Sequence, residues 1–235
     1  MAFKDSKPLI DIVYGRLRDL ILSNELHAGQ KLVDRDLAEQ LNVSRTPIRE
    51  ALGRLTMMGL VENRSQRGYY VRQYTSAEMA DLYEFRKILE VNAATLAAEN
   101  ATSEHLRKFG DILIQLEEQA ASTPNPAKVV ELDLEIHDLI ARASGNESLH
   151  QASQNMMDRV MCTIWVNWVE TAGSGMGGIV SNLEHQGIIE RILERDAEGV
   201  AELVGAHIDN ARDALTETLN ARDEIRRFVL QKAAS

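Results

Sequence analysis

Two residues one helical turn apart could supply ligands for a metal ion. His137 follows Asp133 by four residues, and the apolar residues Val130 and Ile140 place both side chains on the interior face of their helix. A carboxylate oxygen and an imidazole nitrogen are both common ligands of divalent transition metals. The spacing therefore predicts half of a metal site inside a helical domain.

Two further histidines lie at equal distances from Asp196. The polar stretch 194–199 predicts a turn between two antiparallel helices, and each arm from Asp196 to a histidine would span roughly 16 Å at the usual helical rise. His185 and His207 both lie among apolar residues at helical spacing. We therefore expect these two imidazoles to face the core and to lie level with each other.

The combination of four such groups indicates a metal site. A lone buried histidine is usually only hydrogen-bonded, and a buried aspartate can pair with an arginine instead. Burying an unpaired carboxylate costs several kcal/mol, which a divalent cation offsets while it accepts lone pairs from neutral imidazoles. Three nitrogens and one oxygen suit transition metals better than Mg²⁺ or Ca²⁺. We expect Zn²⁺ as the cofactor, with Ni²⁺ or another transition metal as the alternative.

Charge is divided unevenly along the chain. The 235 residues carry a net charge of −10, yet residues 1–74 hold 12 Lys and Arg against 9 Asp and Glu, a net charge of +3. A basic head can present its charge to nucleic acid even when the whole chain is acidic. We expect two domains, residues 1–74 and 75–235, of which only the first contacts DNA.

Nothing in the sequence indicates secretion or a membrane span. The chain has one cysteine, so it can form no intramolecular disulfide, and it has no stretch of about 18 apolar residues. Its first residues lack the apolar core of a secretory signal. We expect a cytoplasmic protein with no membrane contact.

Residues 1–74 show the pattern of a winged helix-turn-helix domain. Helices are predicted from Ile10 to about Leu26, over 34–41, and from an N-cap at Ser44, and short strands over 60–63 and 69–73. Arg45, Thr46 and Arg49 project from the third helix opposite its apolar stripe, where arginine could read guanine in the major groove. The basic tip between the strands could reach the neighbouring groove. Taken singly, each arginine could also do no more than solvate a small helical domain.

Residues 75–235 are predicted to form an all-α antiparallel bundle. Thr75 and Glu78 fit a capping box that opens a long helix. Further helices are expected over about 103–121, 126–143, 147–170, 178–195 and 198–228, with a glycine-rich loop from Gly173 to Gly178. The fold class is therefore mainly α.

A set of motifs covers nearly all of the head: Val33-Asp34-Arg35-Asp36-Leu37-Ala38, Val43-Ser44-Arg45-Thr46-Pro47-Ile48-Arg49-Glu50-Ala51-Leu52, then Leu55, Gly59-Leu60-Val61 and Arg67-Gly68. This set closely resembles the winged helix-turn-helix of GntR-family transcription regulators. The resemblance implies that Arg35, Arg45 and Arg49 contact DNA, with Ser44 and Thr46 on phosphates or base edges, Arg67 at the wing tip, and Gly68 letting the wing approach the backbone.

The body carries a second set of motifs: Arg86 to Glu90, Asp133 to His137 followed by Ser144-Gly145-Asn146, Glu184-His185, and His207. With these the body resembles the FCD domain, the helical effector domain of FadR-like GntR regulators. Metal-binding members of that family use one aspartate and three histidines, which implies Asp133, His137, His185 and His207 as ligands. Ile136 stands where an aromatic residue often precedes the first histidine. In such domains an organic acid binds at open coordination positions, and Arg86 is our candidate partner for its carboxylate.

Together these features predict a homodimeric transcription regulator and not an enzyme. We expect a repressor that reads a pseudo-palindromic operator in double-stranded DNA and responds to a small organic acid. A metal-dependent hydrolase is one alternative, because three histidines and a carboxylate can activate water. No general base stands out for it, since His105 and His150 lie in polar positions expected to be exposed and His27 belongs to the head. A DNA-binding protein with a purely structural metal is the other alternative.

Overall fold

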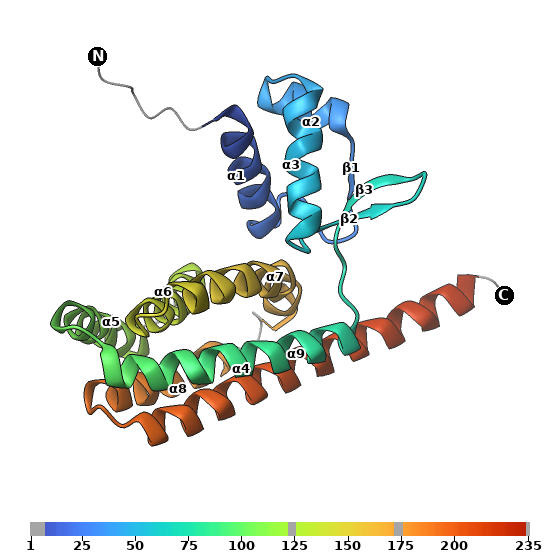
Figure 1. Ribbon diagram of the computed structural model, residues 1–235. Coiled ribbons are helices and arrows are strands. Elements are labelled where there is room, and N and C mark those ends of the chain that lie inside the picture. Colours follow the sequence, from blue (N-terminus) through green and yellow to red (C-terminus); the bar gives the residue numbers. More distant parts are fainter. Residues whose placement is uncertain (1–7, 122–125, 172–175, 234–235) are drawn as a thin grey trace, which may run out of the picture. The chain divides into compact units, whose positions relative to one another are not determined.

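The chain is mainly helical. The computed structural model describes residues 8–121, 126–171 and 176–233. Contacts group Met1–Tyr74 and Asp158–Trp165 into one compact unit, and Thr75–Met157 and Val166–Ser235 into a second. Within the described ranges the only sheet is a small one in the first unit (Figure 1). The predicted fold class is confirmed.

The first unit contains three helices and a short antiparallel sheet. The helices are α1 (Leu9–Leu22), α2 (Asp34–Leu41) and α3 (Arg45–Met57), and the strands are β1 (Lys31–Leu32), β2 (Val61–Arg64) and β3 (Gly68–Val71). The strand order is β1-β3-β2, and β2 and β3 form the hairpin of the predicted wing. Buried aliphatic side chains from α1, α3 and the start of the wing form the core: Leu17, Leu20, Ile48, Leu52, Leu55 and Leu60.

Three local features of the first unit differ from the sequence prediction. α1 ends at Leu22 rather than near Leu26, because Asn24 adopts the left-handed backbone conformation (φ 58°) and turns the chain. β1 was not predicted, since two residues are too few for an alternating pattern. Ser44 occupies the N-cap of α3 as predicted, but its side chain makes no capping hydrogen bond.

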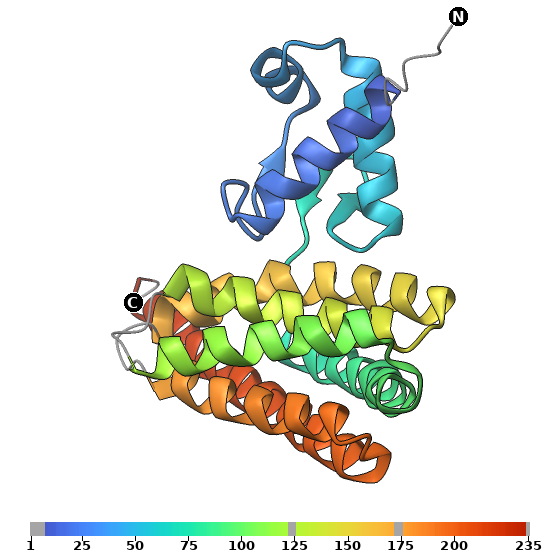
Figure 2. The same ribbon diagram turned by 90° about the vertical axis from the view of Figure 1, so that its left-hand side faces the viewer.

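The second unit is a bundle of long helices (Figure 2). α4 begins at the predicted capping box, where the Glu78 main-chain N–H donates to Thr75 Oγ1 and the Thr75 N–H donates to Glu78 Oε2. α8 begins two residues earlier than predicted, and residues 172–175 of the predicted glycine-rich loop lie outside the described residues. No helix in the described ranges is long and apolar enough to cross a membrane. The helices are α4 (Ser76–Asn100), α5 (Ser103–Ala121), α6 (Pro126–Ala143), α7 (Glu147–Thr171, of which Asp158–Trp165 group with the first unit), α8 (Met176–Leu193) and α9 (Ala197–Ala233).

The turn between α8 and α9 is fixed to the end of α4. Arg195 lies in this turn in the left-handed conformation (φ 61°). Its guanidinium donates to the main-chain oxygens of Ala98 at 3.0 Å and Ala101 at 2.6 Å. Carbonyls at a helix C-terminus have no partner within the helix, so these bonds satisfy them. The α8–α9 hairpin therefore has a fixed position against α4, and α4 and α9 lie side by side (Figures 1 and 2).

Candidate functional site

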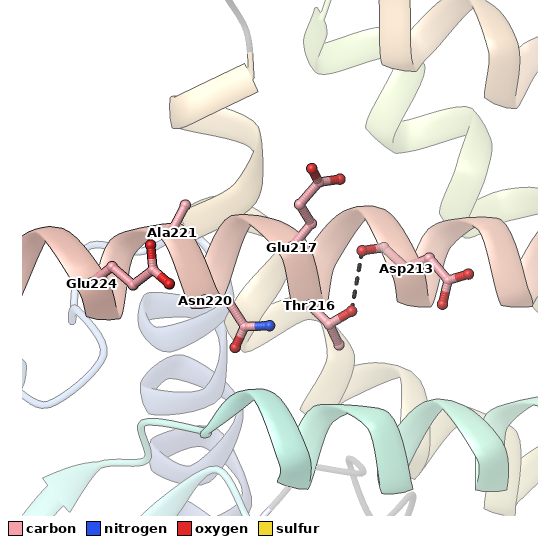
Figure 3. A pocket seen from close by; sticks show the side chains of 6 residues that line it. All are labelled: Asp213, Thr216, Glu217, Asn220, Ala221 and Glu224. Carbon is pink, nitrogen blue, oxygen red and sulfur yellow. Dashed lines mark hydrogen bonds between the residues drawn. The ribbon is translucent and has the colours of Figure 1, made fainter.

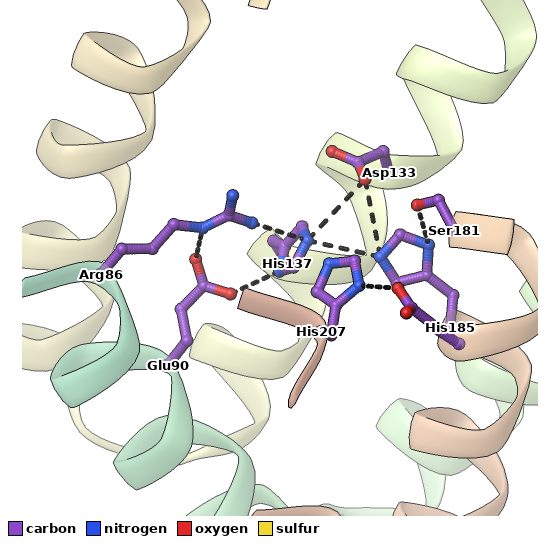
Figure 4. Close-up of polar contacts among 8 residues, drawn as sticks. Arg86, Glu90, Asp133, His137, Ser181, His185 and His207 are labelled. Carbon is purple, nitrogen blue, oxygen red and sulfur yellow. Dashed lines mark hydrogen bonds and ion pairs between the residues drawn. The ribbon is translucent and has the colours of Figure 1, made fainter. Parts of the chain in front are cut away.

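The four residues predicted as a metal-binding group lie together in the second unit (Figure 4). α6 carries Asp133 and His137, α8 carries His185, and α9 carries His207. Nε2 of His185 lies 3.4 Å from Nε2 of His137 and 3.5 Å from Oδ1 of Asp133. The ring centroids of His185 and His207 are 4.5 Å apart. One ligand atom from each residue lies within 4.8 Å of the other three.

The spacing of three of these atoms, on Asp133, His137 and His185, approaches that around a single small cation. Zn–N bonds of about 2.0–2.1 Å in a tetrahedral site place ligand atoms roughly 3.3 Å apart. The distances from His185 are close to this value, and the 3.9 Å from His137 Nε2 to Asp133 Oδ1 is somewhat wider. The histidines are buried, whereas the Asp133 side chain is 24% exposed. The accessible side of the cluster is therefore the side of Asp133.

Each imidazole has a second contact at Nδ1. His207 Nδ1 lies 2.8 Å from Glu184 Oε2, and His185 Nδ1 lies 3.5 Å from Ser181 Oγ. His137 Nδ1 lies 2.6 Å from Glu90 Oε2, which is an ion pair by distance and not an aligned hydrogen bond. At His207 the Glu184 carboxylate holds the proton on Nδ1 and leaves Nε2 with the lone pair that a metal needs.

These outer contacts were missed by reasoning from the sequence. In the sequence, Glu90 and Glu184 only supported the family resemblance, and neither residue was given a role. The four-residue spacing from Arg86 to Glu90 was a usable signal, because it places an ion pair on one helix face. For Glu184 the sequence carries no comparable signal, since its partner His207 lies on another helix.

Arg86 lies beside the same cluster. Only 2% of it is exposed, its Nε donates to Glu90 Oε1 at 2.6 Å, and its Nη2 lies 3.0 Å from His137 Nε2. Because a guanidinium can only donate, His137 Nε2 accepts in this contact, which agrees with a proton on Nδ1. Burial alone would lower the pKa of Arg86, but the Glu90 carboxylate raises it overall. Arg86 is thus a buried, permanent cation.

Burial and charge also set the protonation of the cluster. Burial lowers the pKa of His185 to about 3, so this imidazole is neutral near pH 7. Burial would raise the pKa of Asp133, but His137, His185 and Arg86 outweigh it and the pKa is lowered overall. A neutral imidazole and an ionised carboxylate are the forms that coordinate metals.

The prediction that His150 is exposed was wrong. The residue is 6% exposed, and its Nε2 lies 2.8 Å from Asp138 Oδ1. Arg142 and Gln154 also donate to the Asp138 carboxylate, so α6 and the start of α7 cover the imidazole and satisfy it. His105 is half-buried near the start of α5. Neither histidine belongs to the metal-ligand cluster.

The predicted DNA-contacting residues of the helix-turn-helix are exposed. Ser44, Arg45, Thr46 and Arg49 lie at the N-terminal end of α3, and both arginines contact the Asp34 carboxylate. Arg35 on α2 is 69% exposed at its side chain and pairs with Asp36 at 3.0 Å. The structure thus presents these cations on the surface of the first unit.

The wing tip is also exposed and basic. Gly68 has φ 91°, which glycine adopts without strain, and it begins β3 beside the exposed Arg67. Arg64 pairs with Glu62 at 2.6 Å and lies over the Tyr70 ring at 4.2 Å. Of these two arginines, Arg64 is the one whose guanidinium is held by neighbouring side chains.

A separate hollow runs along α9 (Figure 3). It shares no residue with the metal-ligand cluster, and all of its lining comes from this one helix. The lining is acidic and polar and contains no histidine: Asp213, Thr216, Glu217, Asn220, Ala221 and Glu224. Such a lining is typical of the solvent-exposed face of a helix.

Comparison with known protein families agrees with this architecture. Residues 9–71 match the family of bacterial regulatory proteins, gntR family, and residues 81–210 match the FCD domain. The chain therefore belongs to the GntR family of transcription regulators and carries an FCD domain after its winged helix. Members of this class bind DNA and are not enzymes, so the hydrolase alternative is set aside.

Individual relatives support the same assignment. The Nta operon transcriptional regulator of Aminobacter aminovorans is 30% identical over 200 residues, covering 85% of this chain and 91% of the relative. The structure of E. coli McbR/YncC has a TM-score of 0.75 at 19% identity, covering 90% of this chain and 99% of that one, which shows a shared fold. A structure of the metal-free FCD domain of TM0439 has a TM-score of 0.53 at 25% identity and covers 63% of this chain and 99% of that one.

Proposed function

We propose that this regulator is a homodimeric repressor with its two roles divided between residues 1–74 and 75–235. The first part binds a pseudo-palindromic operator, and the second binds one divalent transition metal ion together with a small carboxylate. The observation that carries the proposal is the convergence of Asp133, His137, His185 and His207 within 4.8 Å.

The donor set favours Zn²⁺, with Ni²⁺ as the alternative. Three imidazole nitrogens and one carboxylate oxygen are the ligands of such ions rather than of Mg²⁺ or Ca²⁺. The contacts of Glu90 and Glu184 at Nδ1 orient two of these rings before any ion arrives. Because these imidazole rings are already oriented, they lose little conformational freedom when the ion binds, which favours high affinity for the metal.

The charges of the side chains explain why an acid would depend on the metal. Asp133, Glu90 and Glu184 contribute three negative charges near the cluster, against one positive charge from Arg86. Protein groups alone would therefore repel a carboxylate, whereas a bound dication neutralises this excess and offers positions for acid oxygens. When His137 Nε2 binds the ion it would give up its contact with Arg86 Nη2, and that desolvated group could then donate to the second end of the acid.

The head supplies operator recognition in this proposal. Arg45 and Arg49 lie at the N-terminal end of α3, where a recognition helix presents its reading side chains to the major groove. Two heads related by two-fold symmetry read two half-sites. The acid changes operator affinity only to the extent that it binds one arrangement of the dimer better than another.

Thermal unfolding of the full-length protein tests the metal and the acid together. Chelator-treated protein should gain thermal stability with Zn²⁺ or Ni²⁺, and a panel of small carboxylates should add a further shift only when metal is present. His185→Asn should abolish both shifts, whereas His105→Asn, outside the cluster, should keep them. Equal metal shifts in both variants would contradict the site, and a metal shift with no response to any acid would leave only a structural metal.

A further inference from the structure

A carboxylate at the start of α2 holds two arginines of α3. Arg45 Nη2 donates to both oxygens of Asp34, at 3.1 and 2.9 Å, and Arg49 Nε donates to Asp34 Oδ2 at 2.6 Å. The arginine side chains are 56% and 62% exposed, while that of Asp34 is 19% exposed. Hydrogen bonds from Arg45 and then Arg49 lower the pKa of Asp34, so it is ionised near neutral pH.

The contacts leave part of each guanidinium available. Arg49 donates to Asp34 through Nε and Arg45 through Nη2, so the other N–H groups of each guanidinium are not used in this pairing. Among the described contacts Asp34 is the acceptor for both side chains. Since reading guanine takes two parallel N–H groups, a held arginine still has donors for a base edge.

We propose that Asp34 is a specificity-determining residue of the DNA-binding head, acting by positioning Arg45 and Arg49 and by opposing their transfer to phosphates. This inference rests on the proposed role of α3 in reading the operator.

The physical reason lies in the difference between phosphate and base contacts. Phosphate contacts supply affinity that carries no sequence information, and they grow with each cation that is free to move to the backbone. An arginine paired with Asp34 must give up that partner to reach a phosphate. A base edge that meets the arginine in its held position requires no such exchange, so the carboxylate weakens random binding more than operator binding.

Full-length protein and two duplexes test the inference. The wild-type protein first selects a preferred sequence from a randomised duplex pool, and the affinities for that sequence and for a scrambled duplex are measured over a range of salt concentrations. Asp34→Asn should bind the scrambled duplex about tenfold more tightly, with a salt slope steeper by up to about one, while affinity for the selected duplex rises at most about threefold. The specificity ratio should therefore fall.

Two further variants separate positioning from net charge and from folding. Glu39→Gln removes one exposed charge from the same helix, and it should change both affinities by a similar, smaller factor. Asp34→Glu keeps the negative charge, so its affinity for the scrambled duplex should remain as low as that of the wild type. Circular dichroism checks that each variant is folded.

The outcomes distinguish this inference from the proposed function. If the wild-type protein selects a sequence but Asp34→Asn leaves the specificity ratio unchanged, Asp34 has no role in discrimination and the inference is overturned. An equal loss of affinity for the selected and the scrambled duplex would also overturn the inference, because Asp34 would then only support the fold of the head. If the wild-type protein selects no sequence at all, the proposed operator reading itself fails.

Discussion

Glu184 Oε2 lies 2.8 Å from Nδ1 of His207, across the gap between α8 and α9. The next residue along α8 is His185, whose Nε2 faces the cluster. Two consecutive residues of one helix therefore serve different roles: one is a candidate ligand and the other orients a candidate ligand on the neighbouring helix.

Removing the charge of Glu184 should weaken metal binding without removing a ligand. In Glu184→Gln the amide can turn either end to His207, so the proton is no longer fixed on Nδ1, and metal affinity should fall about 10–100-fold. Isothermal titration of chelator-treated protein with Zn²⁺ measures the change. Glu190→Gln, an exposed position on the same helix, serves as the control and should bind like the wild type. Indistinguishable affinities of the two variants would show that Glu184 does not act through His207.

Acid should destabilise the protein through His185. Burial lowers its pKa from 6.5 in the unfolded chain to about 3 in the folded chain. Between these values the unfolded chain binds a proton that the folded chain does not, so the free energy of unfolding should fall as the pH falls from about 6.5 toward 3. One such proton changes this free energy by about 1.4 kcal/mol per pH unit.

Urea unfolding of chelator-treated protein at several pH values in this window measures the effect. His185→Asn should give a shallower pH dependence than the wild type, because it lacks the titrating imidazole. The lowered pKa values of Asp133 and Glu90 act in the same direction at lower pH, and that of Glu90 depends on Arg86 and His137, which both proteins keep. Parallel pH dependences would mean that His185 is not the buried neutral base described above.

Arg86→Lys should separate acid binding from metal binding. Lysine keeps the charge but cannot form two parallel hydrogen bonds to a carboxylate, so acid affinity should fall by about 1.5–3 kcal/mol while the metal still binds. Titration of the metal-loaded protein with the acid found by thermal screening provides the measurement. Lys87→Arg, at the adjacent half-exposed position, should leave acid binding intact. A loss confined to metal affinity would instead make Arg86 a support for His137 alone.

Operator binding should depend on Arg49 in a sequence-dependent way. If Arg49 reads a base, Arg49→Ala should weaken binding to the selected duplex by about 1–3 kcal/mol and relax preference at one position. Arg67→Ala at the wing tip should weaken binding to all duplexes and reduce the salt slope by about one. Fluorescence anisotropy at several salt concentrations distinguishes the two patterns. Arg107→Ala, on an exposed face of α5, should change neither.

Regular helix geometry made the histidine cluster predictable from the sequence. His185 and His207 could be predicted to lie level with each other because they are equally far from the turn between two antiparallel helices. Asp133 and His137 could be predicted to lie on one face because they are one helical turn apart. These inferences needed only the helical period and the position of a turn, and the structure has that turn at residues 194–196.

Contacts between distant side chains were not predictable in this way. The approach of Arg86 to His137 depends on how α4 packs against α6, which no local spacing contains. His150 was misjudged because Ser148 and Gln151 beside it are polar, whereas its contact with Asp138 joins it to another helix. The short strand β1 was missed because its pairing with β3 lies far away in sequence.

The bonds from Arg195 to the last carbonyls of α4 restrict how the binding cluster can rearrange. Arg86 lies roughly 18 Å along α4 from Ala98, and His185 lies roughly 15 Å along α8 from Arg195. Because both distances start at the hydrogen bonds of Arg195, sliding of α4 along its axis would break those bonds. α4 also packs against α9, where Lys87 Nζ donates to Asp209 Oδ2 at 2.5 Å, so Arg86 keeps its place beside the histidines of α8 and α9.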